Sequence, residues 1–277
     1  MVRLAVRCKP ELADRVLAHL IELAPGGVEE EHGNGYVEYA IYGAPGELPA
    51  LPKLRAAAGE GLVEVTSGEV PDDWADRWQD FHKPVLIGDR LWVRPSWEEP
   101  REGAIDLVVN PGQAFGTGAH ATTRMCLELL LRLAGTQGKC GALADWGTGS
   151  GVIAIAAAKL GYGPIVACDH ERAALDAAAS NAEANRVELE LVRVNLRTEA
   201  PPPAPTAVAN LTGPILREIA SRVHPVPERL ICSGLLAAEA DSVRVAFAEV
   251  GLAEVERLAE GEWAAISLSG ASASAPA

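Results

Sequence analysis

The chain has 277 residues, with 38 acidic against 24 basic side chains and a formal net charge of −14. Because affinity for a phosphate backbone depends on clustered lysine and arginine side chains, we expect no direct binding to nucleic acid. No apolar run reaches the roughly 18 residues of a membrane-spanning helix, and the five cysteines are widely spaced, so we expect a cytoplasmic protein with reduced thiols and no membrane contact.

Residues 1–66 predict a small α+β domain. The expected elements are a strand at 2–7, an amphipathic helix at 10–24, two short strands within 26–43, a second helix at 48–61 and a strand at 62–70. None of this segment resembles a catalytic constellation.

A helical linker is predicted at 67–84. Its sequence "PDDWADRWQDFHKP" opens with a proline and two aspartates and closes with a second proline, which are the start and stop signals of a short helix. Trp74 and Trp78 lie one turn apart on one face. They are either core residues or a contact that docks the linker against a neighbour.

Residues 85–270 have the alternating pattern of an α/β domain. After strands within 85–97 and 104–112, apolar runs occur at 142–146, 164–169, 189–194, 206–211 and 229–233, with helical segments between them, and two last strands lie near 252–258 and 263–268. This alternation predicts a doubly wound parallel sheet covered by helices on both faces, closed by an antiparallel strand. The tail at 271–277 has no apolar pattern, and we expect it to be disordered.

The stretch "DWGTGSG" ends the first strand of this block and opens a helix. Ligands of doubly wound sheets bind at the carboxyl ends of the strands, and glycine lets a loop backbone approach a ligand closely. A dinucleotide site needs its third glycine at the position of Val152. Gly147, Gly149 and Gly151 therefore favour S-adenosylmethionine, which carries no pyrophosphate, over a nicotinamide dinucleotide.

Asp169 ends the next strand, 22 positions after Gly147. Its carboxylate is expected to accept hydrogen bonds from the ribose hydroxyls of the cofactor. Both cofactor classes use such an acid, so Asp169 indicates a ribose without separating them. The alternative is a solvent-facing aspartate after an ordinary turn.

A second glycine-rich loop, "NPGQAFGTGAHATTR", precedes a helix that we expect to begin at Thr122 or Thr123 with a hydroxyl N-cap. Folded over the cofactor, the loop would bind the methionine carboxylate through its amides and hydroxyls. The alternative is an ordinary capped helix start. We expect His120 to fix this loop by hydrogen bonding rather than to act as a base, and we expect no metal site.

Asn210 ends the fourth strand of the block, in "VANLTGPI". Many amine and amide methyltransferases place there an Asn or Asp followed by two prolines and an aromatic residue, but here Leu211, Thr212 and Gly213 follow. Without an aromatic clamp the site favours a flexible aliphatic amine. The side-chain oxygen of Asn210 and the carbonyl oxygen of Leu211 are expected to orient its N–H bonds. The alternative for Asn210 is an Asx turn at the strand end.

Several of these stretches together resemble the ribosomal protein L11 methyltransferases. The similarity rests on "FGTGAHATTR", "DWGTGSGVIAIAAAKLG", "VANL" and "SGLLAAEADSV", in this order, and on "WADRWQDFHKPVLIG", which resembles the interdomain region of the family. The resemblance implies a seven-stranded class I methyltransferase domain of Rossmann-like fold behind a small N-terminal substrate-recognition domain. It implies S-adenosyl-L-methionine as cofactor, Asn210 as the catalytic residue, and cofactor contacts at Thr123, Gly147, Gly149, Asp169 and Asn210.

The expected activity is therefore N-methylation of lysine side chains, and of α-amino groups, on a large-subunit ribosomal protein by a monomeric enzyme. Two alternatives remain open from the sequence. One is a related lysine methyltransferase that acts on a different protein. The other is a non-catalytic module that binds the cofactor.

Overall fold

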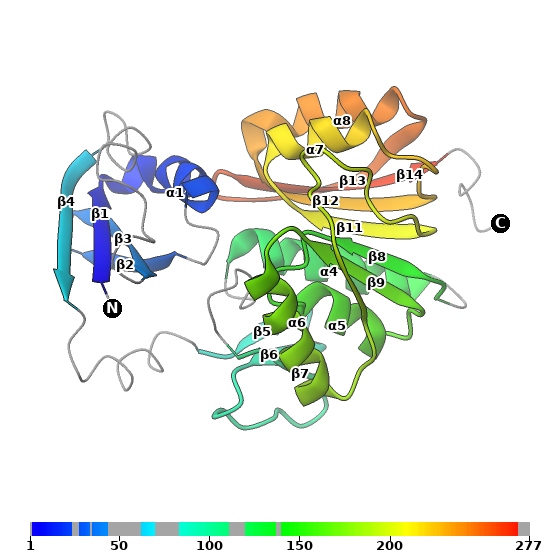
Figure 1. The fold of residues 1–277 in the computed structure, drawn as a ribbon, viewed down its shortest axis with the longest axis horizontal. Helices are drawn as coiled ribbons and strands as arrows, with labels where there is room; N and C mark the ends of the chain where they lie inside the picture. Colours follow the sequence, from blue (N-terminus) through cyan, green and yellow to red (C-terminus); the bar gives the residue numbers. More distant parts are fainter. Residues whose placement is uncertain are drawn as a thin grey trace. The chain divides into compact units, whose positions relative to one another are not determined.

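The computed structural model describes residues 2–23, 28–33, 35–43, 62–69, 83–110, 120–136 and 140–270. These residues form two compact units, one built from the segments up to residue 69 and one from residue 83 onward (Figure 1). The helix predicted at 48–61, residues 70–82 of the predicted linker, loop 111–119 and the tail at 271–277 lie outside the described residues.

The first unit is an antiparallel sheet of strand order β2-β3-β1-β4 with one described α-helix. Its elements are β1 (Val2–Cys8), a 3-10 turn (Pro10–Leu12), α1 (Ala13–Leu23), β2 (Glu29–Gly33), β3 (Tyr36–Gly43) and β4 (Leu62–Glu69). Helix α1 buries Ala13, Val16, Leu17 and Leu20, whose spacing of three and four residues places them on one face. The described strands and this helix follow the predicted order.

The second unit contains a small sheet of order β5-β6-β7 and a seven-stranded sheet of order β10-β9-β8-β11-β12-β14-β13. The small sheet consists of β5 (Val85–Ile87), β6 (Leu91–Arg94) and β7 (Ile105–Val108). The large sheet consists of β8 (Leu143–Trp146), β9 (Ile165–Asp169), β10 (Glu190–Arg193), β11 (Thr206–Asn210), β12 (Arg229–Leu236), β13 (Leu252–Glu260) and β14 (Trp263–Gly270). Strands β8 to β12 pair in parallel and β14 pairs antiparallel with β12, which confirms the doubly wound sheet and its closing hairpin.

Helices cover both faces of the large sheet (Figure 1). One face carries α4 (Ala121–Thr136), α5 (Val152–Lys159) and α6 (Arg172–Asn185), and the other carries α7 (Gly213–Ala220) and α8 (Ala240–Ala248). Helix α5 buries six consecutive residues from Val152 to Ala157, because it packs on β8 and β9 between α4 and α6. Beneath α7 and α8 the core contains Trp146, Leu216 and Phe247.

One expectation about the connections is wrong. The alternating pattern predicted a helix between each pair of parallel strands, but β10 and β11 are joined by turns and extended chain at 194–205. Four prolines lie in the last five residues of this connection, at 201–203 and 205. Proline lacks the amide proton that a helix interior needs, and it disfavours helical backbone at the preceding residue.

Strand order determines which loops meet at the carboxyl edge of the large sheet. Strand β8 pairs with β9 on one side, where Trp146 lies opposite Cys168, and with β11 on the other, where Trp146 lies opposite Ala209. The residue after Trp146 is therefore flanked by the ends of β9 and β11. This is the topological switch point, where doubly wound sheets bind their ligands.

Candidate functional site

The loop at residues 147–151 begins at the switch point with left-handed backbone. Gly147 has φ +78°, Gly149 φ +52° and Gly151 φ +84°, a region that residues with a Cβ rarely adopt. The amides of Gly147 and Thr148 both donate to the carbonyl of Cys168 at 2.9 Å, which ties the loop to the end of β9. The glycine pattern therefore encodes the conformation of the loop as well as space for a ligand.

Neighbouring protein atoms explain two of these glycines further. A Cβ on Gly147 would lie 2.5 Å from Cδ2 of Leu211, and a Cβ on Gly151 would lie 3.1 Å from Cα and Cβ of Ala178. The first contact brings the glycine loop against the segment that follows β11. The second allows α5 and α6 to pack closely.

Asp169, the predicted ribose contact, bonds to the glycine loop. Its Oδ2 accepts a hydrogen bond from the amide of Gly149 at 3.1 Å, and its Oδ1 accepts one from the amide of Glu171 at 3.1 Å. Nδ1 of His170 also lies 3.3 Å from Oδ1. A carboxylate oxygen can accept more than one hydrogen bond, so Oδ2, with one protein donor, retains capacity for a ligand donor. The side chain is 13% exposed, which leaves it within reach of that ligand.

Asp145 is a residue of this site that the sequence analysis missed. It lies in β8, fully buried, and its Oδ2 accepts from the Thr148 hydroxyl at 2.7 Å and from the Ala154 amide at 3.2 Å. Its Oδ1 is buried and has no hydrogen-bond partner among the described residues. Burial raises the pKa of Asp145 to about 7, although the two hydrogen bonds lower it. The sequence signal that could have identified Asp145 is its position two residues before Gly147, the first glycine of the loop.

Asp145 is expected to make the protein less stable as the pH rises from about 4 to about 7. Its folded-state pKa of about 7 lies above the usual aspartate value, so across this window the folded chain holds a proton that the unfolded chain has released. The stability contribution of this group is thus fully present below about pH 4 and lost above about pH 7. Thermal unfolding near pH 5 and near pH 7.5 measures it. The Asp145→Asn variant, which cannot titrate, should lose less in Tm between these pH values than wild type, and equal losses would contradict the assignment.

Asn210 ends β11 and points to helix α4. Its Nδ2 donates to Oγ1 of Thr123 at 3.2 Å, a contact between residues 87 positions apart. Its Oδ1 is buried without a hydrogen-bond partner in the described part of the chain. An Asx turn would have used that oxygen to accept from the backbone, so the structural alternative for Asn210 is not formed. The amide is instead fixed by Thr123, with its acceptor unused.

The start of α4 differs from the prediction. The helix begins at Ala121, and the Arg124 amide donates to the His120 carbonyl at 3.0 Å, so Thr122 and Thr123 lie in the first turn rather than at the N-cap. The hydroxyl of Thr122 bonds Nδ1 of His120 at 2.8 Å. The His120 ring also meets the ring of Trp263 edge to face, with 5.0 Å between the centroids. These contacts agree with a positioning role for His120.

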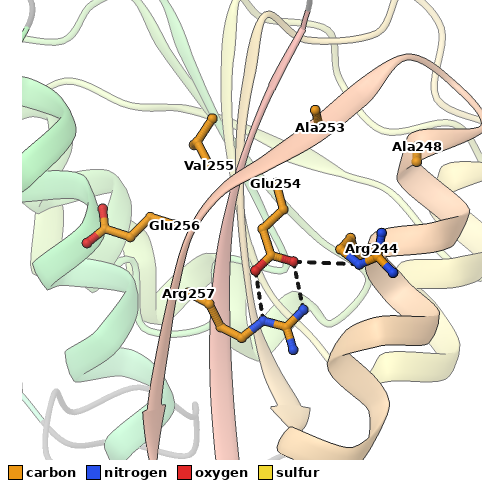
Figure 2. A pocket seen from close by; sticks show the side chains of 7 residues that line it. All are labelled: Arg244, Ala248, Ala253, Glu254, Val255, Glu256 and Arg257. Atoms are coloured by element: carbon orange, nitrogen blue, oxygen red, sulfur yellow. Dashed lines mark hydrogen bonds and ion pairs between the residues drawn. The ribbon is translucent and has the colours of Figure 1, made fainter.

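A pocket between α8 and β13 lies apart from these residues (Figure 2). Its charged side chains are paired, since Glu254 bonds Arg257 at 2.7 Å and lies 3.8 Å from Arg244, and Glu256 pairs with Arg132 outside the pocket. The pocket contains none of the predicted site residues. We therefore place the candidate site at the carboxyl edge of the sheet.

Three further properties concern the described residues as a group. They contain no cluster of three or more His, Cys, Asp or Glu side chains arranged to hold a metal ion. None of their helices has the length and apolar character needed to cross a membrane. The five cysteines are free thiols, of which Cys8, Cys126, Cys168 and Cys232 are buried.

Comparison with known proteins gives consistent results. Residues 52–270 match the family model of ribosomal protein L11 methyltransferase (PrmA). A ribosomal protein L11 methyltransferase from Pelotomaculum thermopropionicum is 35% identical over 304 aligned residues, covering 96% of this chain and 97% of that protein. One from Salmonella heidelberg is 41% identical over 74% of this chain and 70% of that protein. The crystal structure of a ribosomal protein L11 methylase from Lactobacillus delbrueckii subsp. bulgaricus superposes with a TM-score of 0.60 and 27% identity, covering 68% of this chain and 98% of that chain.

Proposed function

The chain belongs to the ribosomal protein L11 methyltransferase family, and from this premise we propose that it methylates amino groups of ribosomal protein L11. It is an S-adenosylmethionine-dependent protein methyltransferase with the class I fold. The observation that carries the proposal is the position of Gly147 between the ends of β9 and β11, with unused buried acceptors on Asp145 and Asn210. A nicotinamide oxidoreductase and a non-catalytic module are not favoured.

The residues at the carboxyl edge fit S-adenosylmethionine. We assign the ribose hydroxyls to Asp169, whose Oδ2 has one protein donor and retains accepting capacity. The unpartnered Oδ1 of Asp145 is a buried acceptor in the strand that enters the glycine loop, and it suits the α-ammonium of the methionine moiety. Gly147 and Gly149 allow the loop backbone to approach the cofactor closely. Thr123 fixes the side chain of Asn210 through a hydrogen bond.

Asn210 is assigned to the reacting amine. When bound, S-adenosylmethionine would supply an electrophilic methyl group, and the lone pair of the substrate amine would form the new N–C bond as the C–S bond breaks and its electron pair stays on sulfur. A lysine ammonium must first become neutral, because only the neutral amine has a free lone pair. The Asn210 amide is held by Thr123, and its Oδ1, unpartnered among the described residues, accepts a hydrogen bond from the amine N–H group. This hydrogen bond aligns the lone pair of the amine with the methyl group.

Lysine side chains are the favoured acceptors, with α-amino groups as a further class. No aromatic residue follows Asn210, so the strand end lacks a clamp for a planar group. We assign selection of ribosomal protein L11 to the first unit, whose four-stranded sheet folds as a compact unit separate from the glycine loop.

Transfer of labelled methyl from S-adenosylmethionine to purified ribosomal protein L11 tests the function. We expect label in this protein, on lysine residues identified by mass spectrometry. A mixture of all ribosomal proteins serves as the competing substrate, and label entering a different protein would overturn the assignment. The same assay on a chain that lacks residues 1–69 tests the recognition role of the first unit.

Asp169→Ala is expected to weaken cofactor binding about tenfold or more, because a hydrogen bond to a charged group contributes about 1.5–3 kcal/mol. Calorimetric titration with S-adenosylhomocysteine measures the change. Asp176→Ala is the matched control, since it removes an exposed carboxylate from α6. Unchanged affinity in the Asp169 variant would refute the ribose contact.

A further inference from the structure

Thr212 carries a buried hydroxyl that the activity described above does not use. Its Oγ1 has no hydrogen-bond partner among the described residues, which is also true of Oδ1 of Asn210 two positions earlier. Burying a hydroxyl without a partner costs free energy of folding, so such a group either weakens the protein or awaits a ligand.

Backbone geometry places the two acceptors on one side of the chain. Asn210 is the last residue of β11, the Leu211 amide still donates to the Ser233 carbonyl of β12 at 2.9 Å, and Thr212 is extended with φ −65° and ψ 151°. In extended chain, side chains two positions apart point to the same side. If Leu211 continues the extended chain, the side chains of Asn210 and Thr212 share one side of the segment at the carboxyl edge of the sheet.

The hydroxyl has no structural task that would account for it. Thr212 is the N-cap residue of α7, yet its side chain makes no capping hydrogen bond. Replacing it with valine, which has the same shape, therefore removes no cap.

The neutral amine of an unmethylated lysine has two N–H groups, and Oδ1 of Asn210 accepts a hydrogen bond from one of them in the proposed mechanism. The sequence predicts the Leu211 carbonyl as the acceptor for the second N–H group. In the structure that peptide group packs against Gly234, where a Cβ would lie 2.8 Å from the Leu211 oxygen. The Thr212 hydroxyl is buried and unpartnered among the described residues, so it is available as the second acceptor.

We propose that Thr212 is a second catalytic residue, an inference that rests on the proposed methylation of lysine. Its Oγ1 accepts a hydrogen bond from the N–H group of the substrate amine that Asn210 does not bind. When both N–H groups are fixed by hydrogen bonds, the lone pair of the amine can point in only one direction. Each transfer forms one N–C bond, breaks one C–S bond and releases one proton to water, so each product has one N–H bond fewer than its precursor. The contribution of Thr212 consequently decreases with every methyl group added.

Single-turnover kinetics of Thr212→Val on L11 carrying unmethylated, monomethylated or dimethylated lysine tests the proposal. We expect the first transfer to slow about tenfold, the value of about one hydrogen bond, the second to slow less, and the third to stay within about twofold of wild type. Thr212→Ser, which keeps the hydroxyl, should restore the first transfer. Affinity for S-adenosylhomocysteine should be unchanged, and Tm should be unchanged or higher because an unpaired buried hydroxyl is removed.

Three outcomes would overturn the proposal. Unchanged transfer rates in Thr212→Val would indicate that the Leu211 carbonyl accepts the hydrogen bond from the second N–H group. Equal slowing of all three transfers, or a loss of S-adenosylhomocysteine affinity, would indicate a structural role for Thr212. Failure of the wild-type enzyme to methylate ribosomal protein L11 is a separate result, and it would overturn the proposed function itself.

Discussion

Asn210→Ala is expected to lower the rate of methyl transfer about 10²-fold or more, with a much smaller loss of cofactor affinity. The side chain ends β11 with its Nδ2 held by Thr123 and its Oδ1 free, so its removal leaves the amine without its main orienting acceptor. Misplacement of a reacting group by about 1 Å costs rate on this scale. Single-turnover kinetics at saturating S-adenosylmethionine measures the transfer step directly.

Two variants control for this result. Thr123→Val leaves the Asn210 oxygen in place but removes the contact that fixes its amide, so an intermediate loss of rate is expected. Asn210→Asp keeps an oxygen acceptor, and the Thr123 hydroxyl can donate to it, so this variant should retain more activity than alanine. A normal transfer rate in Asn210→Ala would show that Asn210 has only a structural role.

Gly234→Ala is expected to lower the transfer rate to a similar extent, about 10²-fold, although Gly234 contacts no reacting atom in our assignment. Gly234 lies in β12 with φ +79°, and a Cβ there would lie 2.8 Å from both the amide nitrogen and the carbonyl oxygen of Leu211. Backbone atoms cannot rotate away as a side chain does. The segment that carries Asn210 and Thr212 must therefore move.

Gly251→Ala is the matched control for this prediction. Gly251 has φ +91°, so alanine there suffers comparable backbone strain, but its Cβ would meet no atom within 4 Å in the described part of the chain. Both variants should lower Tm, as measured by thermal unfolding, whereas only Gly234→Ala should slow methyl transfer. Equal transfer rates in the two variants would show that the position of the Leu211 peptide does not control the amine site.

Local patterns in the sequence were sufficient to locate most elements of the large sheet. Apolar runs of five or six residues mark the parallel strands, and the strands from β8 to β12 lie within or beside the predicted runs. The connection at 194–205 was mispredicted because the alternating pattern was extended over a segment whose prolines exclude a helix. The start of α4 was misplaced by one or two residues because two threonines, which are both favourable N-cap residues, stand side by side there.

For the site, the sequence by itself determined the glycine loop and the two strand-end residues Asp169 and Asn210, because backbone freedom and position after an apolar run are local properties. Only the tertiary structure decided that β11 pairs with β8, which brings Asn210 to Gly147 and within 3.2 Å of Thr123. It alone revealed the burial of Asp145 and the unpartnered Oγ1 of Thr212, since burial and hydrogen-bond satisfaction depend on every element packed around a side chain. Pairing between strands far apart in the chain is decided by how whole faces pack together, and no local window of sequence contains that information.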